Sequence, residues 1–370
     1  MRRRQAAFTL VEMTIAMAIV MVVLYAAINF FIISVRQYKV QTKITESNLE
    51  GILGLELFRQ DLESLGYGLP WNDPGNYSEK TGNGSVLNDG NGIAPRAVAS
   101  INGGGGFTVN NSDYLVIKSA RVGMSDAAGK WTTLTKAGNK RTWSPLTENL
   151  ADNDYVIVLA LGSTDANRRS LVNNISPYTT YSALSPASTD FLPVDPYSAN
   201  IIYGIDNAPP VRPFNRAEYY IDNTAVPRRC APNTGILVKT VVAHDASGTT
   251  PTLLPLLDCV ADMQVEYGLD TNADGVLDNT YSDDISVGKT AADIRAQLLE
   301  VRVSILAQEG QRDDSYAYPY DNVTVGSGGA GRTFNFTSFG FTSSGNVMNN
   351  FKHYRWKVYN IVVKPKNLAQ

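Results

Sequence analysis

The chain has 370 residues, of which 44% are hydrophobic and 18% charged, so it is too apolar to be disordered and long enough to bury a sizeable core. Its formal net charge is −3, and removal of the first seven residues, which include three arginines, leaves 29 basic against 35 acidic residues, or −6. A mildly acidic chain lacks the basic surplus of nucleic-acid-binding proteins, so we predict no nucleic-acid partner.

The first predicted element is an apolar helix over residues 8–35, in which Glu12 is the only residue that ionises. This segment is longer than the about 20 apolar residues that cross a bilayer as a helix. Arginines at positions 2–4 precede it, so we expect the N-terminus to stay cytoplasmic and the rest to be exported to the periplasm. A secretory signal peptide is cut after its apolar run, whereas the small pair Ala6-Ala7 precedes this run, so a cut there would retain the helix.

Glu12 stands out because a carboxylate near the end of an apolar helix is costly, and such a residue is a functional hypothesis by default. In one interpretation Glu12 lies at the membrane interface and is solvated. In the other it pairs with a cation. A cut after Ala7 would create that cation, because Phe8 would then carry a free amine close by.

The sequence Ala7-Phe8-Thr9-Leu10-Val11-Glu12 resembles the class III signal of type IV prepilins and type II secretion pseudopilins. The resemblance implies that a prepilin peptidase cuts between Ala7 and Phe8 and methylates the Phe8 amine. It also implies that Glu12 pairs with that amine on an adjacent subunit in the filament core. Ala7 stands where glycine is usual, which keeps a small residue beside the cut. Asn29 replaces a frequent kinking proline, so we expect an unkinked helix.

The helical pattern continues beyond the membrane segment. Leu55, Phe58, Leu62 and Leu65 recur at spacings of three and four, which predicts a buried stripe on one helix face. The glycines of Gly66-Tyr67-Gly68 then stop the helix. No heptad pattern is sustained, so a coiled coil is not expected. We predict one helix to about residue 65.

Residues 72–112 are rich in glycine and asparagine and predict loop, with one short strand near 97–101. The runs of apolar residues that follow predict an antiparallel sheet with one buried face. Its strands are expected at 114–118, 155–159, 218–221, 235–242, 263–267, 299–305 and 354–363. The proline-rich stretch 163–215 predicts loop, and 291–298 predict a short helix.

A long helix followed by antiparallel strands predicts an α+β fold. The prepilin resemblance independently implies the same arrangement, the pilin fold, with the sheet packed on the second half of the helix. We therefore expect a leader (1–7), a transmembrane or filament-core helix (8–35), an amphipathic continuation (36–66) and a periplasmic or extracellular β-rich head with many loops (67–370). So large a head is hard to pack at every position of a filament, which favours a low-copy subunit.

A second resemblance is to the PilW family of minor pilins. Residues 57–68 resemble the end of that family's helix, and residues 264–275, 301–305 and the closing strand around Asn360 resemble parts of its head. Residues 70–215 match no family that we recognise. A minor pseudopilin of type II secretion is a close relative and stays open as an alternative.

Two cysteines, Cys230 and Cys259, are separated by 28 residues. In an exported chain an even pair predicts a disulfide, which would contribute about 3–4 kcal/mol in the chain-entropy model. Two free buried thiols are the alternative.

The segment from Asp270 to Asp278 matches the first half of a calcium loop of the EF-hand type. Oxygen ligands are expected from Asp270, Asn272, Asp274, the Val276 carbonyl and Asp278. The bidentate glutamate normal at position 12 is absent. A turn between two strands would use the same residue types, so calcium and a plain turn both stay open.

The resemblances imply a minor type IV pilin that helps to prime filament assembly in a complex at the tip. The implied partners are prepilin peptidase, other minor and major pilins, the inner-membrane assembly platform and a large tip adhesin. We expect a single-pass inner-membrane protein before assembly and a place at the pilus tip afterwards. A tip adhesin is the alternative from a different class. No nucleophile stands beside a base in any known motif, so we predict no enzymatic activity and no organic cofactor.

Overall fold

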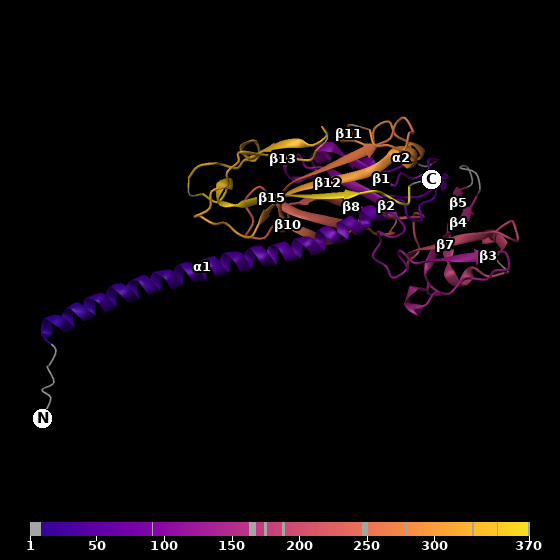
Figure 1. The fold of residues 1–370 in the computed structure, drawn as a ribbon. Helices are drawn as coiled ribbons and strands as arrows, with labels where there is room; N and C mark the ends of the chain where they lie inside the picture. Colours follow the sequence, from indigo (N-terminus) through magenta and orange to yellow (C-terminus); the bar gives the residue numbers. More distant parts are fainter. Residues whose placement is uncertain are drawn as a thin grey trace, which may run out of the picture.

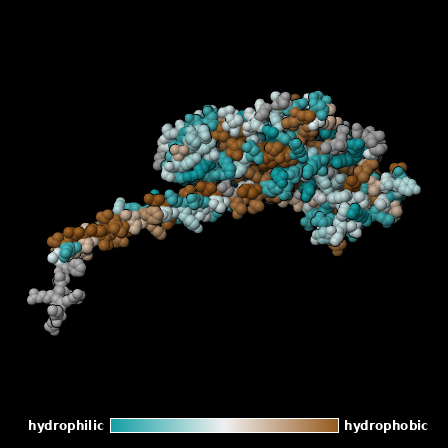
Figure 2. Space-filling model, in the orientation of Figure 1, coloured by the Kyte–Doolittle hydropathy of each residue, from teal (hydrophilic) through white to brown (hydrophobic). Residues whose placement is uncertain are grey.

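The computed structural model describes residues 9–90, 92–162, 168–173, 176–186, 189–245, 251–278, 280–327, 329–345 and 347–368. Helix α1 (Leu10–Glu63) runs unbroken for 54 residues, or ~81 Å, as the sequence predicted. Its first part stands clear of the head and its last part lies against the sheet (Figure 1). The free part is hydrophobic along most of its length (Figure 2).

The main sheet has eight antiparallel strands within the described residues, in the order β1-β2-β8-β9-β10-β12-β15, with β11 paired to β10. Its strands are β1 (Val98–Ile101), β2 (Tyr114–Ser119), β8 (Asn215–Asp222), β9 (Gly235–Val242), β10 (Pro251–Leu269), β11 (Tyr281–Ser282), β12 (Leu298–Glu309) and β15 (Arg355–Val363). Helix α2 (Ala291–Gln297) precedes β12, where a short helix was predicted. A long helix on an antiparallel sheet confirms the predicted α+β class.

A second sheet is inserted between β2 and β8, and we call it the inserted sheet. The described strands follow the order β3-β7-β4-β5, with β6 paired to β4. They are β3 (Trp131–Thr135), β4 (Tyr155–Leu161), β5 (Arg168–Leu171), β6 (Tyr178–Thr180) and β7 (Ala199–Asp206). Residues 163–215 were predicted to be rich in loops, and the strands β5, β6 and β7 that lie within them were not predicted. The prolines of this stretch lie between these strands rather than inside them.

Smaller elements complete the head. A hairpin of β13 (Asn322–Val325) and β14 (Arg332–Asn335) packs beside β10 and β12. The described 3₁₀ turns are η1 (Ser85–Leu87), η2 (Asn102–Gly106), η3 (Val109–Asn111), η4 (Leu146–Glu148), η5 (Tyr181–Ala183), η6 (Thr189–Phe191), η7 (Phe336–Phe339) and η8 (Phe351–His353).

The main core lies between the last part of α1 and one face of the main sheet. The predicted stripe of Leu55, Phe58, Leu62 and Leu65 is buried there. The Phe58 ring stacks on Tyr219 of β8 with centroids 4.5 Å apart. The apolar face of the helix, which repeats every 3.6 residues, therefore packs on the apolar face of the strands, which repeats every two residues.

One glycine, Gly54, lets α1 approach β10 closely. A Cβ atom built on Gly54 would lie 1.8 Å from the backbone oxygen of Leu256, whereas one on Gly51 would meet only the tip of the Leu257 side chain, at 2.8 Å. The backbone of β10 thus occupies the space that any side chain at Gly54 would need. Glycine at this position sets the distance between helix and sheet.

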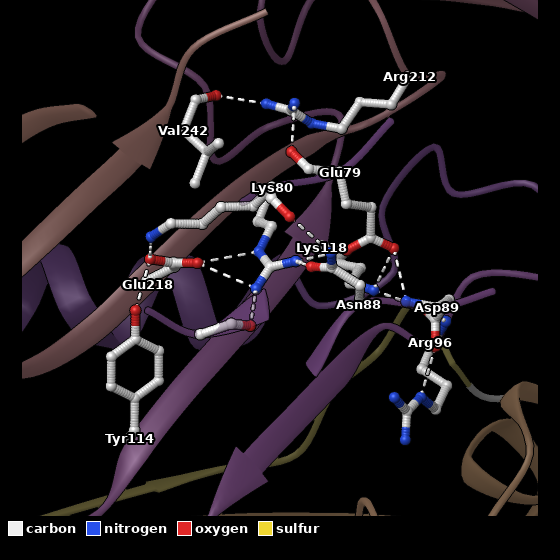
Figure 3. Close-up of polar contacts among 12 residues, drawn as sticks. Glu79, Lys80, Asn88, Asp89, Arg96, Tyr114, Lys118, Arg212, Glu218 and Val242 are labelled. Atoms are coloured by element: carbon white, nitrogen blue, oxygen red, sulfur yellow. Dashed lines mark hydrogen bonds and ion pairs between the residues drawn. The ribbon is translucent and has the colours of Figure 1, made fainter. Parts of the chain in front are cut away.

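The opposite face of β2 and β8 is covered by residues 77–96 through a buried cluster of charges, which we call the charge network (Figure 3). It contains five cations and three carboxylates among the described residues: Lys80, Arg96, Lys118, Arg212 and Arg216 with Glu79, Asp89 and Glu218. Buried charges require partners, and some of the partners here, such as Glu79 and Arg216, are more than 100 residues apart in the chain.

Glu79 is at the centre of the charge network. Its carboxylate lies 2.8 Å from Lys118 Nζ and 2.5 Å from Arg216 Nη1, and it accepts the Asp89 N–H at 2.9 Å. Arg216 also contacts Glu218 at 3.0 Å. The contacts of Glu79 with Lys118 and Arg216 join the covering segment to the sheet, and the other two contacts hold Glu79 and Arg216 in position. The network therefore fixes the segment over the sheet.

His244 is partly buried near the junction of the two sheets. Its Nδ1 accepts the Val211 N–H at 3.4 Å, so the proton is on Nε2, which donates to Asn215 Oδ1 at 2.9 Å. Burial and the nearby Arg212 guanidinium lower the pKa of His244 to about 3. The folded protein therefore holds this imidazole neutral at pH values where an unfolded chain would protonate it.

We expect His244 to make the protein less stable as the pH falls from about 6.5 toward 3, because only the unfolded chain binds the proton in this range. The contribution approaches ~1.4 kcal/mol per pH unit. His244→Gln should remove it, so the difference in unfolding free energy between variant and parent should shift in favour of the variant as the pH falls from 6.5 to 4. Burial raises the pKa of Asp113 to about 7, which makes the unfolding free energy rise as the pH falls. This contribution is the same in the parent protein and the variant. Equal slopes in urea unfolding would contradict the assignment.

Candidate assembly helix and head sites

The free part of α1 has the surface of a helix that packs in lipid or against other helices. Its large apolar side chains from Leu10 to Ile33 are 44–82% exposed. Among the described residues α1 is the one helix long and apolar enough to cross a membrane. So long an apolar surface is unfavourable in water and must be covered by lipid or by protein.

Glu12 lies at the start of this helix, in a capping box. Its Oε2 accepts hydrogen bonds from the backbone N–H and the hydroxyl of Thr9, both at 2.9 Å, and its own N–H donates to Thr9 Oγ1 at 3.3 Å. A carboxylate in the first turn interacts favourably with the helix dipole. Within the described residues Oε1 accepts no hydrogen bond, so one carboxylate oxygen is held by the cap and the other is available to a cation.

The predicted cleavage and methylation residues, Ala7 and Phe8, lie outside the described residues. Pairing of Glu12 with the Phe8 amine of a neighbouring subunit therefore stays a prediction.

The disulfide prediction is confirmed, and the alternative of free thiols is excluded. Cys230 and Cys259 are bonded, with Cα atoms 4.9 Å apart. Cys259 lies in β10 at a register shift, and Cys230 lies in the connection between β8 and β9. The bridge therefore fixes this connection to the strand that packs against α1.

The predicted calcium loop directly follows β10. Both oxygens of the buried Asp270 carboxylate accept backbone N–H groups, from Asp274 at 3.1 Å and Gly275 at 2.8 Å. Asp274 in turn accepts the Val276 N–H at 2.8 Å, and Asp278 accepts the Thr271 N–H at 3.1 Å.

These carboxylates stabilise the turn directly. Asn272 also accepts the Asp274 N–H, at 3.2 Å. The described residues hold no group of three or more His, Cys, Asp or Glu side chains placed to share a metal ion. The geometry therefore fits the alternative of a plain turn, and calcium binding stays a prediction.

The charge network and the two histidines are held by contacts within the head. The network residues are enclosed by the segment 77–96, and His244 holds the junction of the sheets. His353 Nδ1 lies 3.1 Å from the carbonyl oxygen of Tyr316, a contact within the head. The network was missed at the sequence level because its members look like ordinary loop and strand charges.

Two family models match the chain. The model described as type IV pilus-assembly protein W, or PilW, matches residues 218–367, and the prokaryotic N-terminal methylation motif matches residues 2–28. The chain is thus similar to PilW over residues 218–367 and to type IV prepilins at its N-terminus. The PilW match begins in β8 and includes β9, β10, β12 and β15, so the inserted sheet lies outside both matches.

Comparison with solved structures found a type IV-like pilin from Thermus thermophilus. The similarity covers 42% of this chain and 80% of that one, at 12% sequence identity and a TM-score of 0.19. A likeness this low adds nothing to the assignment, which rests on the two sequence models. No curated protein matched the chain.

Proposed function

We propose that this chain is a minor type IV pilin of the PilW type, and that it joins other minor pilins in a complex priming filament assembly at the tip. The observation that carries the proposal is the exposed apolar part of α1, with Glu12 at its start, in a chain that has the methylation motif. Such a helix can leave the bilayer only if equivalent helices replace the lipid around it. A head with two sheets is hard to pack at every position of a filament, which supports a subunit present in few copies.

Before assembly the protein would span the inner membrane once, with the N-terminus in the cytoplasm and the head in the periplasm. Prepilin peptidase, the assembly platform, major and minor pilins and a large tip adhesin are its proposed partners. A minor pseudopilin of a secretion system is the alternative in the same class.

Intact-mass and N-terminal analysis of the protein from cells with and without prepilin peptidase tests the first step. We expect a mature chain that begins at N-methylated Phe8 only when the peptidase is present. A chain that begins at Met1 in both strains would remove the basis for incorporation into a filament.

Deletion of the protein tests whether it takes part in priming filament assembly. Loss of surface filaments, with labelled protein at filament tips in the parent strain, is the expected result. Normal piliation with lost attachment would assign an adhesin role instead, and normal piliation with lost protein secretion would assign a pseudopilus.

Glu12→Gln is expected to lower the amount of the protein in sheared filaments by at least about tenfold, while processing and membrane insertion persist. An amide cannot form an ion pair with the amine of a neighbouring subunit, and loss of one partner of a buried charge pair is costly. Quantitative immunoblots of filament and membrane fractions measure the effect.

Glu46→Gln is the matched control, because Glu46 is exposed on α1 and, among the described residues, forms its ion pair with Lys43 of the same helix, at 2.6 Å. We expect this variant to enter filaments normally. Equal incorporation of both variants would contradict a docking role for Glu12.

A further inference from the structure

A cavity of about 290 Å³ lies where the inserted sheet meets the chain that leaves α1. We call it the tryptophan cavity, and its lining includes Tyr67, Arg121, Lys130, Trp131, Trp143 and Glu148. We propose that the tryptophan cavity binds a sugar residue of an acidic polysaccharide. This role goes beyond filament assembly and does not depend on it.

The two indole rings are held against each other at an interplanar angle of 56°, and the Arg141 guanidinium lies over the Trp143 ring at 4.1 Å, so Trp131 is the more accessible ring. Trp131 begins β3 and is 37% exposed, and its ring centroid lies 4.8 Å from that of Trp143. Trp143 Nε1 donates to the Trp131 carbonyl oxygen at 2.7 Å, and its backbone N–H donates to Asn149 Oδ1 at 2.7 Å. Large rigid aromatic rings that are already held in place lose little freedom on binding, and their flat faces suit the C–H face of a sugar ring.

Three charged side chains of the cavity indicate which kind of ligand it binds. Within the part of the chain that the structure describes, no salt bridge pairs Arg121, Lys130 or Glu148 with an opposite charge, although all three line the cavity. Two cations can hold a carboxylate, which guanidinium groups bind in a bidentate manner. A carboxylate at Glu148 can accept hydroxyl groups, which are abundant on sugars.

The same charges weigh against a nucleic acid as the ligand. Single-stranded nucleic acids also stack on aromatic rings, but their phosphates require a groove that is positive throughout. Glu148 interrupts such a groove, and the chain as a whole is acidic. A uronic acid, with one carboxylate and several hydroxyls on each ring, fits the mixed charges better.

The position of the cavity suits a ligand that arrives from outside. Tyr67 comes from the end of α1 and its hydroxyl lies 3.5 Å from the Gly129 carbonyl oxygen, so the cavity lies between two structural units, a frequent location for ligand sites. The inserted sheet lies at the end of the molecule opposite the N-terminus (Figure 1). The volume is near the lower limit of about 300–1,000 Å³ for ligand pockets, which suits one ring of a longer chain.

Isothermal titration calorimetry of the full-length protein, in a detergent without a sugar head group, tests the proposal. The probes are tri-galacturonate, neutral galactotriose and a short oligo-deoxythymidine. We expect tri-galacturonate to bind at least tenfold more tightly than galactotriose, and Trp131→Ala to weaken its binding at least tenfold. Arg121→Gln should reduce the preference for the acidic sugar. Tyr197→Ala, at a 98% exposed aromatic residue two positions before β7, is the matched control and should bind normally.

Four results would overturn the proposal. These are no binding of tri-galacturonate by the parent protein, equal binding of galactotriose, tighter binding of the oligonucleotide, or normal binding by both cavity variants. Near-ultraviolet circular dichroism establishes that each variant is folded. If Trp131→Ala fails to fold, Arg121→Gln decides the outcome, because Arg121 is an exposed residue.

Discussion

Gly54→Ala is expected to lower the free energy of unfolding by more than about 3 kcal/mol. The new Cβ would lie 1.8 Å from the Leu256 backbone oxygen, a separation that only a shift of helix or strand can relieve. That shift would open the core along Phe58 and Leu62, which pack on the sheet beside it. Thermal unfolding of the full chain in detergent, followed by near-ultraviolet circular dichroism, should show a midpoint at least ~5 °C lower.

Gly51→Ala is a closely matched control, one helical turn earlier on the same helix. Its new Cβ would meet only the Leu257 Cδ1 atom, at 2.8 Å, and a flexible side-chain tip can move. Alanine also favours the helix by about 0.5–1 kcal/mol over glycine, so the net change should be near zero. Similar losses in the two variants would contradict a specific backbone approach at Gly54.

Glu79→Gln is expected to cost about 3–5 kcal/mol of unfolding free energy. The charge network has five cations and three carboxylates, and this change leaves five against two. Lys118 and Arg216 would each lose a carboxylate partner while fully buried. Urea unfolding measures the loss. Faster proteolysis within residues 77–96 should accompany it, because these contacts hold the segment over the sheet.

Glu63→Gln tests whether the effect comes from burial rather than from the loss of any carboxylate. Glu63 pairs with Arg59 on the exposed side of α1, at 2.5 Å, and an exposed pair of this kind contributes at most about 0.5 kcal/mol. A large loss in Glu63→Gln, or a small one in Glu79→Gln, would contradict the importance of the charge network.

Local periodicity explains which parts of the fold could be predicted. The stripe from Leu55 to Leu65 and the alternation in β12 each place apolar side chains on one face, and both were predicted and found buried. β7 was missed because Asn200 and Gly204 interrupt its apolar run and prolines flank it. In the structure Asn200 donates to the Phe191 carbonyl oxygen, so a buried amide replaces an apolar residue.

Long-range partners explain what could not be predicted. Glu79 and Arg216 are 137 residues apart, and neither has a local signal that names the other. Trp131 and Trp143 are conspicuous in the sequence, but the contact between their rings depends on the turn between them. Gly54 did carry a usable signal, because a glycine inside a helical pattern can indicate a close backbone approach.

The two strands that flank the insertion have a wider consequence. β2 and β8 are direct neighbours in the main sheet, and Ser119 pairs with Asn215 in their register. The chain therefore leaves the main sheet and returns to it at adjacent points, so β2 can pair with β8 whatever segment is inserted between them. Evolution or protein engineering could exchange this module for another without rebuilding the helix-and-sheet body. The helix-and-sheet body and the inserted sheet are thus free to diversify separately.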